Sequence, residues 1–436
     1  MGNKTIQVIC MNLQAVGQFC LRHGVAAEAL ELSRETEKLL FEMREGLAGR
    51  PSSLYMIPTY LSGDPVYGTG ECAIVMDAGG TNFRIAAVTF EAGGGVRVEG
   101  FRKAPMPGTH GAISCDAFFD CIAEFIRDYQ EHSDRVGFCF SFPTEILPNR
   151  DGRILGFSKE VEVPDAAGRL IGEGVNAALA RMGIAPKRFS ILNDTVAAML
   201  CGIGEADRAY DGYIGFILGT GTNTCYLERR EEIGKIGGGR GSMAVNMESG
   251  CYSGFPQGDF DRALDAASQN PGDHLAEKML GGVYLGELIS RALHAAAAEG
   301  LFSEAVRCAL PEERYYTMPE ISAFLAGEGP LADLCGTESD REVLTALIRN
   351  FMDRAARITA VTFAAILQKT GQGKDPARPV SILAEGTTFY RAPFFREYLD
   401  RYLEEYLAGE LGFHCEIRSA EDATLIGTAV AALCQE

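Results

Sequence analysis

Two apolar segments flank a glycine turn in the stretch Met76-Asp77-Ala78-Gly79-Gly80-Thr81-Asn82-Phe83-Arg84. This pattern predicts strands at 72–76 and 83–90 that pair as a hairpin around the glycines. A second apolar hairpin, predicted at 213–218 and 224–228, encloses Gly219-Thr220-Gly221-Thr222-Asn223. The two hairpins resemble each other in sequence and in position between strands, and the segments around them are predicted to be helical. We therefore predict two α/β lobes with a ligand in the cleft between them.

Both glycine turns are suited to bind phosphate. Glycine has no Cβ, so the backbone can come close to a phosphate group and point its N–H groups at the oxygens. Thr81 and Thr220 add hydroxyl donors. The chain contains no Gly-x-x-x-x-Gly-Lys-Ser/Thr, which excludes a P-loop. One glycine hairpin alone would indicate a simple turn, whereas two matching hairpins favour phosphate binding.

Two acidic residues stand where predicted strands end. Asp77 precedes the first glycines, where a carboxylate can hold Mg²⁺ or its water ligands near a polyphosphate. Asp194 follows a predicted strand at 189–192, and the sequence leaves two interpretations of it open. It is an N-cap of the helix that begins there, or it accepts a hydroxyl proton during phosphoryl transfer.

The remaining segments alternate between helices and strands. We predict a connector at 56–65, a strand at 136–142 and another at 380–383. The predicted helices lie at 25–47, 116–132, 171–183, across most of 259–371, and at 392–407 and 422–433.

Composition excludes several classes of function. The 436 residues include 40 Lys and Arg against 59 Asp and Glu, and the resulting net charge of −19 argues against nucleic-acid partners and anionic membranes. The sequence has no apolar run of roughly 18 residues, so we expect no membrane span, and the N-terminal stretch is a poor secretion signal. We therefore expect a cytoplasmic protein. The 13 Cys and six His are scattered, which predicts reduced thiols and no metal cluster.

Further motifs extend the pattern in a fixed order. They are Phe140-Ser141-Phe142-Pro143, Leu192-Asn193-Asp194-Thr195, Val245-Asn246-Met247-Glu248, and the stretch from Asn270 through Glu277 to Leu288. Together with the glycine hairpins, these motifs resemble the hexokinase family over nearly the whole chain. The resemblance implies an α/β, two-lobed, actin-like and ribonuclease-H-like ATPase fold with a cleft between a small and a large lobe. It also implies ATP-dependent transfer of the γ-phosphoryl group to the 6-hydroxyl of a hexose such as glucose.

The same resemblance divides the chain into four segments. Residues 1–63 form N-terminal helices and a connector that belong to the large lobe, and residues 64–192 form the small lobe. Residues 193–421 form the rest of the large lobe, and the helix in 422–436 returns to the small lobe. The lobes are expected to close on the sugar, and the protein to be a monomer or a homodimer.

The resemblance also assigns roles to individual residues. Asp194 is the general base, and Lys159 is a positive neighbour of the reacting groups. The sugar-binding residues are Ser141, Phe142, Pro143, Ser158, Lys159, Asn193, Asp194, Asn223, Glu248 and Glu277. The nucleotide-binding residues are Asp77, Gly79, Gly80, Thr81, Asn82, Arg84, Gly219, Thr220, Gly221, Thr222, Gly386 and Thr387. ATP and Mg²⁺ are the implied cofactors, with Asp77 and Asp194 as ligands of Mg²⁺ through water.

Three positions depart from the family pattern. Phe157-Ser158 stands where the family usually has Trp-Thr, Ser249 replaces a Trp after the sugar-binding Glu, and Glu385-Gly386-Thr387 replaces Asp-Gly-Ser. These departures lie beside the sugar and base pockets, so they bear on sugar preference and donor rather than on reaction type.

Two other functions are compatible with the fold. One is a catalytically silent sugar-sensing regulatory protein, because fold alone does not determine function. The other is an actin-like ATPase that hydrolyses ATP without sugar. The joint presence of Asp194, Lys159 and the sugar-binding residues favours the kinase.

Overall fold

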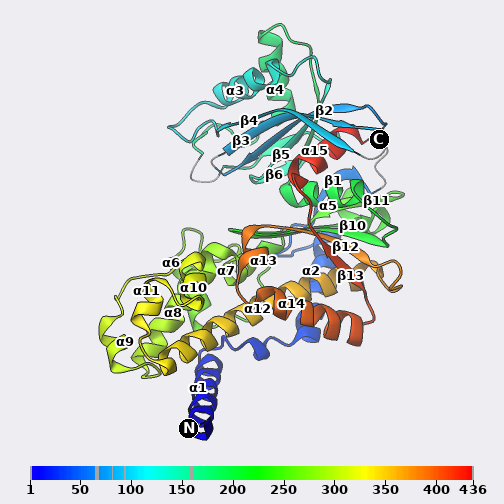
Figure 1. Ribbon diagram of the computed structural model, residues 1–436. Helices are drawn as coiled ribbons and strands as arrows, with labels where there is room; N and C mark the ends of the chain where they lie inside the picture. The colour runs from blue at the N-terminus through cyan, green and yellow to red at the C-terminus, as the bar shows by residue number, and fades with distance from the viewer. Residues whose placement is uncertain (1, 64–67, 81, 93–94, 158–160, 435–436) are drawn as a thin grey trace.

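Two sheets form the centres of two lobes in the computed structural model, which describes residues 2–63, 68–80, 82–92, 95–157 and 161–434 (Figure 1). The five-stranded sheet has the order β4-β3-β2-β5-β8, and the six-stranded sheet the order β1-β11-β10-β9-β12-β13. The strands of the first are β2 (Cys72–Gly79), β3 (Asn82–Phe90), β4 (Val96–Pro105), β5 (Arg135–Phe140) and β8 (Arg188–Leu192). Those of the second are β1 (Ile57–Ser62), β9 (Gly212–Leu218), β10 (Thr222–Arg229), β11 (Ser242–Asn246), β12 (Val380–Glu385) and β13 (Cys415–Arg418). A short ribbon pairs β6 (Thr144–Ile146) with β7 (Gly152–Ile154).

The two sheets repeat one topology. In each, three strands form an antiparallel meander, β2-β3-β4 or β9-β10-β11, and two parallel strands follow on the far side of the first. Both glycine turns join the first and second strands of their meander, so they occupy equivalent places. The two predicted hairpins and the two-lobed α/β architecture are confirmed.

Helices cover both sheets and the space between them (Figure 1). The small lobe carries α3 (Cys115–Arg127) and α4 (Ile171–Arg181), and α5 (Asp194–Gly204) and α15 (Ala423–Leu433) lie between the sheets. The other α-helices are α1 (Gly2–Arg22), α2 (Leu32–Leu47), α6 (Asp259–Ala267), α7 (Leu275–Leu280), α8 (Gly282–Ala298), α9 (Glu304–Ala309), α10 (Met318–Leu325), α11 (Gly329–Leu334), α12 (Glu338–Thr370), α13 (Thr387–Arg391) and α14 (Phe395–Tyr402). Short 3₁₀ turns lie at Ala27–Ala29, Arg230–Glu232, Gly234–Ile236 and Ser249–Cys251, and a π-helix at Leu403–Glu410. Across the described ranges, no helix has both the length and the apolar character to cross a membrane.

Several local predictions are wrong. The connector predicted at 56–65 contains β1, an edge strand in which Ile57 pairs with Asn246 of β11; Pro58 is compatible with an edge position. The helix predicted at 25–47 begins only at Leu32, because a 3₁₀ turn at Ala27–Ala29 with extended residues on either side buries Val25 and Leu30 in the core. The helix predicted at 392–407 begins at Phe395 and continues into the π-helix.

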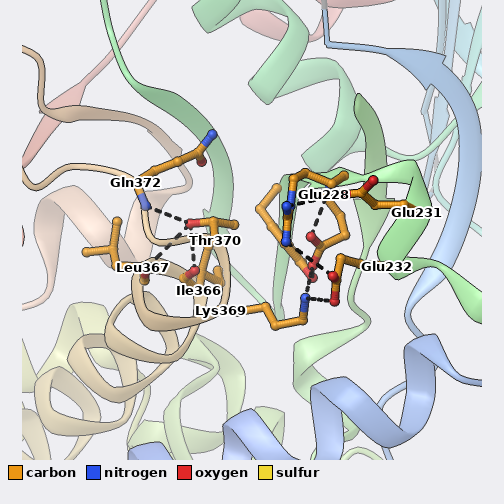
Figure 2. A network of polar contacts seen from close by, with 10 residues as sticks. Glu228, Glu231, Glu232, Ile366, Leu367, Lys369, Thr370 and Gln372 are labelled. Carbon is orange, nitrogen blue, oxygen red and sulfur yellow. Dashed lines mark hydrogen bonds and ion pairs between the residues drawn. The ribbon is translucent and has the colours of Figure 1, made fainter. Parts of the chain in front are cut away.

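An ion-pair network anchors the end of α12 to the large-lobe sheet (Figure 2). Lys369 Nζ lies 2.9 Å from Glu228 Oε2 and 3.3 Å from Glu232 Oε2. The hydroxyl of Tyr226 donates to Glu228 Oε2 at 2.8 Å. Since Lys369 and Glu228 are both almost fully buried, removing Lys369 would leave the buried charge of Glu228 without an opposite charge, whereas Lys369 has Glu232 as a second partner.

Glycines allow close backbone contacts around α5 and α15, the helices between the two sheets. A Cβ on Gly427 of α15 would lie 1.8 Å from the carbonyl oxygen of Ala197 in α5, and one on Gly137 of β5 would lie 2.2 Å from Thr428 O. On the other side of α5, a Cβ on Gly215 of β9 would lie 2.1 Å from Thr195 O. Real Cβ atoms are not found at such distances, so both helices pack against their neighbours backbone to backbone.

Replacing Gly427 with Ala should therefore destabilise the protein. The opposing atom belongs to a helix backbone and cannot rotate away, so we expect Gly427→Ala to lower the free energy of unfolding by roughly 1–3 kcal/mol, as overpacking does. Urea unfolding measures this change. Gly17→Ala is the matched control, because Gly17 lies within α1 and a Cβ there meets no atom within 4 Å. Equal stability of Gly427→Ala and wild type would contradict the packing described.

Candidate active site

One cavity of about 940 Å³ brings residues of both lobes together. Sixteen of the residues predicted from the sequence line it: Asp77, Gly79, Gly80, Arg84, Ser141, Phe142, Pro143, Asn193, Asp194, Thr220, Gly221, Thr222, Asn223, Glu248, Glu277 and Gly386. Three other predicted residues do not line the cavity but are next to residues that do. Asn82 pairs with Gly79 across the β2–β3 ladder, Gly219 precedes Thr220, and Thr387 follows Gly386. Thr81, Ser158 and Lys159 lie outside the described residues. Asp194, Asp77 and Thr220 thus share a single crevice.

Asp194 occupies the corner between β8 and α5. The side chain of the preceding residue, Asn193, is the N-cap: its Oδ1 accepts from Thr195 N at 3.0 Å and from Thr195 Oγ1 at 2.7 Å. The interpretation of Asp194 as the N-cap is therefore wrong, because the cap lies one residue earlier. Asp194 is the first helical residue; its Oδ1 accepts from Thr195 N at 2.8 Å, and its side chain lines the cavity.

The environment of Asp194 raises its pKa to about 7. Burial is the largest cause, followed by the negative charges of Asp77 and Glu248, while hydrogen bonds from Thr195 and Ser141 act in the opposite direction. A carboxyl group with a pKa near neutrality can accept a proton and release it again at working pH, which is the property of a general base.

Asp77 lies beside the first glycine turn. Arg84 Nη1, from the paired strand β3, donates to Asp77 Oδ2 at 2.6 Å. Burial raises the pKa of Asp77, and the Arg84 guanidinium partly opposes that effect. Two carboxylates, Asp77 and Asp194, thus border the glycine turns, and this donor set suits Mg²⁺, which prefers oxygen ligands.

A hydrogen-bonded chain of amides ends at the carboxylate of Glu248 in the cavity lining. Asn223 Nδ2 donates to Asn246 Oδ1 at 2.8 Å, and Asn246 Nδ2 donates to Glu248 Oε1 at 2.7 Å. The backbone of Glu248 is left-handed, with φ of 53°. Burial also raises the pKa of Glu248. These contacts orient groups that can donate to and accept from adjacent hydroxyls.

The second glycine turn depends on the absence of Cβ atoms. Glu277 Oε2 accepts from Thr222 N at 3.0 Å, and a Cβ on Gly221 would lie 2.2 Å from the same oxygen. Gly386 has φ of 111°, and a Cβ on it would lie 2.3 Å from Leu218 O. Three segments therefore meet closely here: the glycine turn, the N-terminal end of α7 and the β12–α13 junction. Their backbones can approach a bound phosphate because glycine has no Cβ.

Nine lining residues were not assigned to the site from the sequence, although Glu385 belongs to a motif expected beside the pockets. They are Tyr55, Ile57, Thr144, Leu155, Ile217, Asp273, His274, Glu385 and Thr424. Spacing offered a signal for two of them, because Asp273 and His274 lie within one helical turn before Glu277. The position of Tyr55 could not be foreseen, because it depends on the pairing of β1 with β11.

Comparisons with known proteins agree on one family. Two hexokinase family models match residues 20–203 and 213–434. Hexokinase-3 of Oryza sativa subsp. japonica is 28% identical, covering 94% of this chain and 88% of that protein, and Hexokinase-1 of Nicotiana tabacum is 30% identical, covering 92% and 87%. A hexokinase structure from Schistosoma mansoni, complexed with glucose, aligns with a TM-score of 0.77 at 23% identity, covering 98% of this chain and 100% of that one. The structural likeness confirms the actin-like, two-lobed fold.

The electrostatic coupling in the cavity leads to a prediction about Asp194. If the charge of Asp77 helps to raise the pKa of Asp194, then Asp77→Asn should lower it toward the ordinary aspartate range. Carboxyl-carbon NMR titration of wild type and variant measures the shift. Asp333→Asn, at an exposed position of α11, is the control and should leave the titration unchanged. A pKa of Asp194 that is the same in wild type and Asp77→Asn would disprove the coupling.

Proposed function

This chain belongs to the hexokinase family, and from that premise we propose that it transfers the γ-phosphoryl group of ATP to the 6-hydroxyl of a hexose such as glucose. The observation that carries the proposal is the shared cavity, in which Asp194 faces the same space as both glycine turns and the sugar-binding set. The glucose complex of the Schistosoma mansoni hexokinase supports the choice of sugar.

Asp194 would act as the general base. It accepts the proton of the sugar hydroxyl as that oxygen attacks the terminal phosphorus, and its raised pKa matches a proton transfer near neutral pH. The Asn193 cap and the hydrogen bond from Thr195 N to Asp194 Oδ1 orient Asp194 at the start of α5, where its carboxylate would face the bound sugar. Lys159 would add positive charge near the reacting groups.

Hexose recognition would rest on paired donors and acceptors. Asn223 and Glu248 are oriented by Asn246, and Glu277 retains a second carboxylate oxygen beyond the one that accepts from Thr222. A sugar that lacks a matching hydroxyl leaves one of these buried groups unpaired, which costs about 1–3 kcal/mol. This penalty selects the stereochemistry of the substrate.

The triphosphate would bind along the two glycine turns and Gly386. Mg²⁺ bound with ATP would be held by Asp77 and Asp194 through water and would neutralise phosphate charge. The residues come from both lobes, so approach of the lobes on sugar binding would complete the set and exclude water.

The direct test is ADP release from ATP and Mg²⁺ with a panel of glucose, mannose, fructose, glucosamine and N-acetylated sugars. We expect at least one hexose to stimulate release strongly over the rate without sugar. Sugar binding without any stimulation would instead support the sugar-sensing protein, and release that ignores sugar would support the actin-like ATPase.

Replacing the base should separate binding from chemistry. Asp194→Asn keeps the size of the side chain but cannot accept the proton, so kcat should fall by about 10²–10⁴-fold while hexose affinity stays within a small factor. Steady-state kinetics and calorimetric glucose binding measure the two effects. Asp333→Asn serves again as the control and should behave like wild type. Turnover of Asp194→Asn at the wild-type rate would remove Asp194 from the mechanism.

The pKa of Asp194 also predicts a pH profile. The ionised form is the active base, so kcat/KM should be constant above about pH 7 and fall tenfold per pH unit below it. In Asp77→Asn the fall should begin at lower pH, because one of the charges that raises the pKa of Asp194 is gone. A wild-type profile that stays flat to pH 5 would contradict this assignment.

A further inference from the structure

Three side chains beside the sugar-binding carboxylates form a cluster that the proposed reaction does not use. Cys251, Asp273 and His274 each offer one ligand atom, and these atoms lie within 4.8 Å of one another. Cys251 ends the 3₁₀ turn Ser249–Cys251, and the other two residues immediately precede α7. A backbone hydrogen bond of 3.0 Å, from Ala276 N to Tyr252 O, holds the two segments together.

The chemistry of the cluster is that of a zinc-type site. A thiolate, an imidazole nitrogen and a carboxylate oxygen are the ligands of Zn²⁺, whereas Mg²⁺ prefers oxygen alone. Cys251 is only 7% exposed, and Asp273 and His274 line the cavity. Three protein ligands with one side open to the cavity correspond to a zinc site that keeps a free coordination position.

Two further observations point to a cation. His274 Nδ1 is buried and has no hydrogen-bond partner among the described residues, although Asp273 Oδ2 lies 3.0 Å away. The region is also rich in negative charge, because the carboxylates of Glu248, Asp273 and Glu277 line the same cavity. A bound divalent cation would take His274 Nδ1 and the neighbouring Asp273 oxygen as ligands and offset the accumulated negative charge.

We propose that Cys251, Asp273 and His274 form a binding site for Zn²⁺ or a divalent cation of the same class, and that the bound cation weakens hexose binding. Glu248 lies three residues before Cys251, and Glu277 lies three residues after His274. A cation in the cluster attracts both carboxylates and competes with the sugar hydroxyls for them. The cation site stands by itself, whereas its effect on hexose rests on the proposed function.

Metal binding tests the site without any sugar. Cobalt substitution should produce a thiolate-to-cobalt charge-transfer band in the wild-type protein, and a chromophoric chelator should compete for Zn²⁺. Cys251→Ser and His274→Asn should each lower the affinity for Zn²⁺ by about 100-fold or more, since changes even outside the ligand shell cost 10–100-fold. Asparagine tolerates the left-handed backbone at His274, where φ is 51°.

The matched control is Cys308→Ser, because Cys308 is an exposed thiol on α9. This variant should keep both the band and the affinity, and thermal unfolding of all variants should show that they remain folded. Absence of the band in wild type, or its persistence in Cys251→Ser, would overturn the site.

Calorimetric glucose binding with and without Zn²⁺ tests the coupling. The ion should weaken glucose binding to wild type but not to Cys251→Ser, and glucose should weaken Zn²⁺ binding by the same factor, because the coupling is reciprocal. Glucose affinity that does not change with Zn²⁺ would refute the antagonism. Failure to bind glucose at all would count against the proposed function, while the cobalt band would still decide the cation site.

Discussion

The position of Asp194 depends on backbone-to-backbone packing around α5. This helix lies between α15 and β9, and glycine forms the contact on each side, through Gly427 and Gly215. α15 in turn touches β5 at Gly137. A continuous stack therefore runs from one sheet through two helices to the other, with no side chain at its tightest points. Such a stack transmits displacement well, because close-packed backbone atoms cannot rearrange as side chains do.

This packing places the carboxylate of Asp194 in a buried site, where its ionisation is unfavourable. Asp194 shares its cavity with Asp77 and Glu248, and the pKa of each is raised mainly by burial. Arg84 offsets part of this charge through Asp77 only. A surplus of buried carboxylate charge makes the cavity receptive to cations. Magnesium accompanying a triphosphate would offset part of this charge, and a cation bound by Cys251, Asp273 and His274 would offset more of it.

Much of the architecture was accessible from the sequence because it depends on local patterns. The glycine turns at Gly79 and Gly219 each interrupt an apolar run. Glycines between two apolar runs predict a hairpin without knowledge of the rest of the fold. The edge strand β1 and the place of Tyr55 in the cavity depend on pairing with β11, which is distant in sequence and carries no local signal. The N-cap was misplaced by one residue because Asn and Asp are equally good caps, and only backbone geometry separates Asn193 from Asp194.

The two positions where the family pattern has Trp show how this chain fills the same space. Phe157 packs with Phe118, Phe140 and Phe142 at ring-centroid distances of 5.3, 5.7 and 5.0 Å, so an aromatic cluster occupies that wall of the small lobe. At the second position, the Ser249 hydroxyl lies 2.8 Å from the buried Thr224 hydroxyl, and Ser249 N donates to Asn223 Oδ1 at 3.3 Å. One substitution retains apolar bulk, whereas the other replaces bulk with a side-chain hydrogen bond to Thr224, the residue that follows Asn223. Sugar preference in this chain should therefore depend more on the second position, because apolar bulk is lost there between Asn223 and Glu248, two residues proposed to bind the hexose.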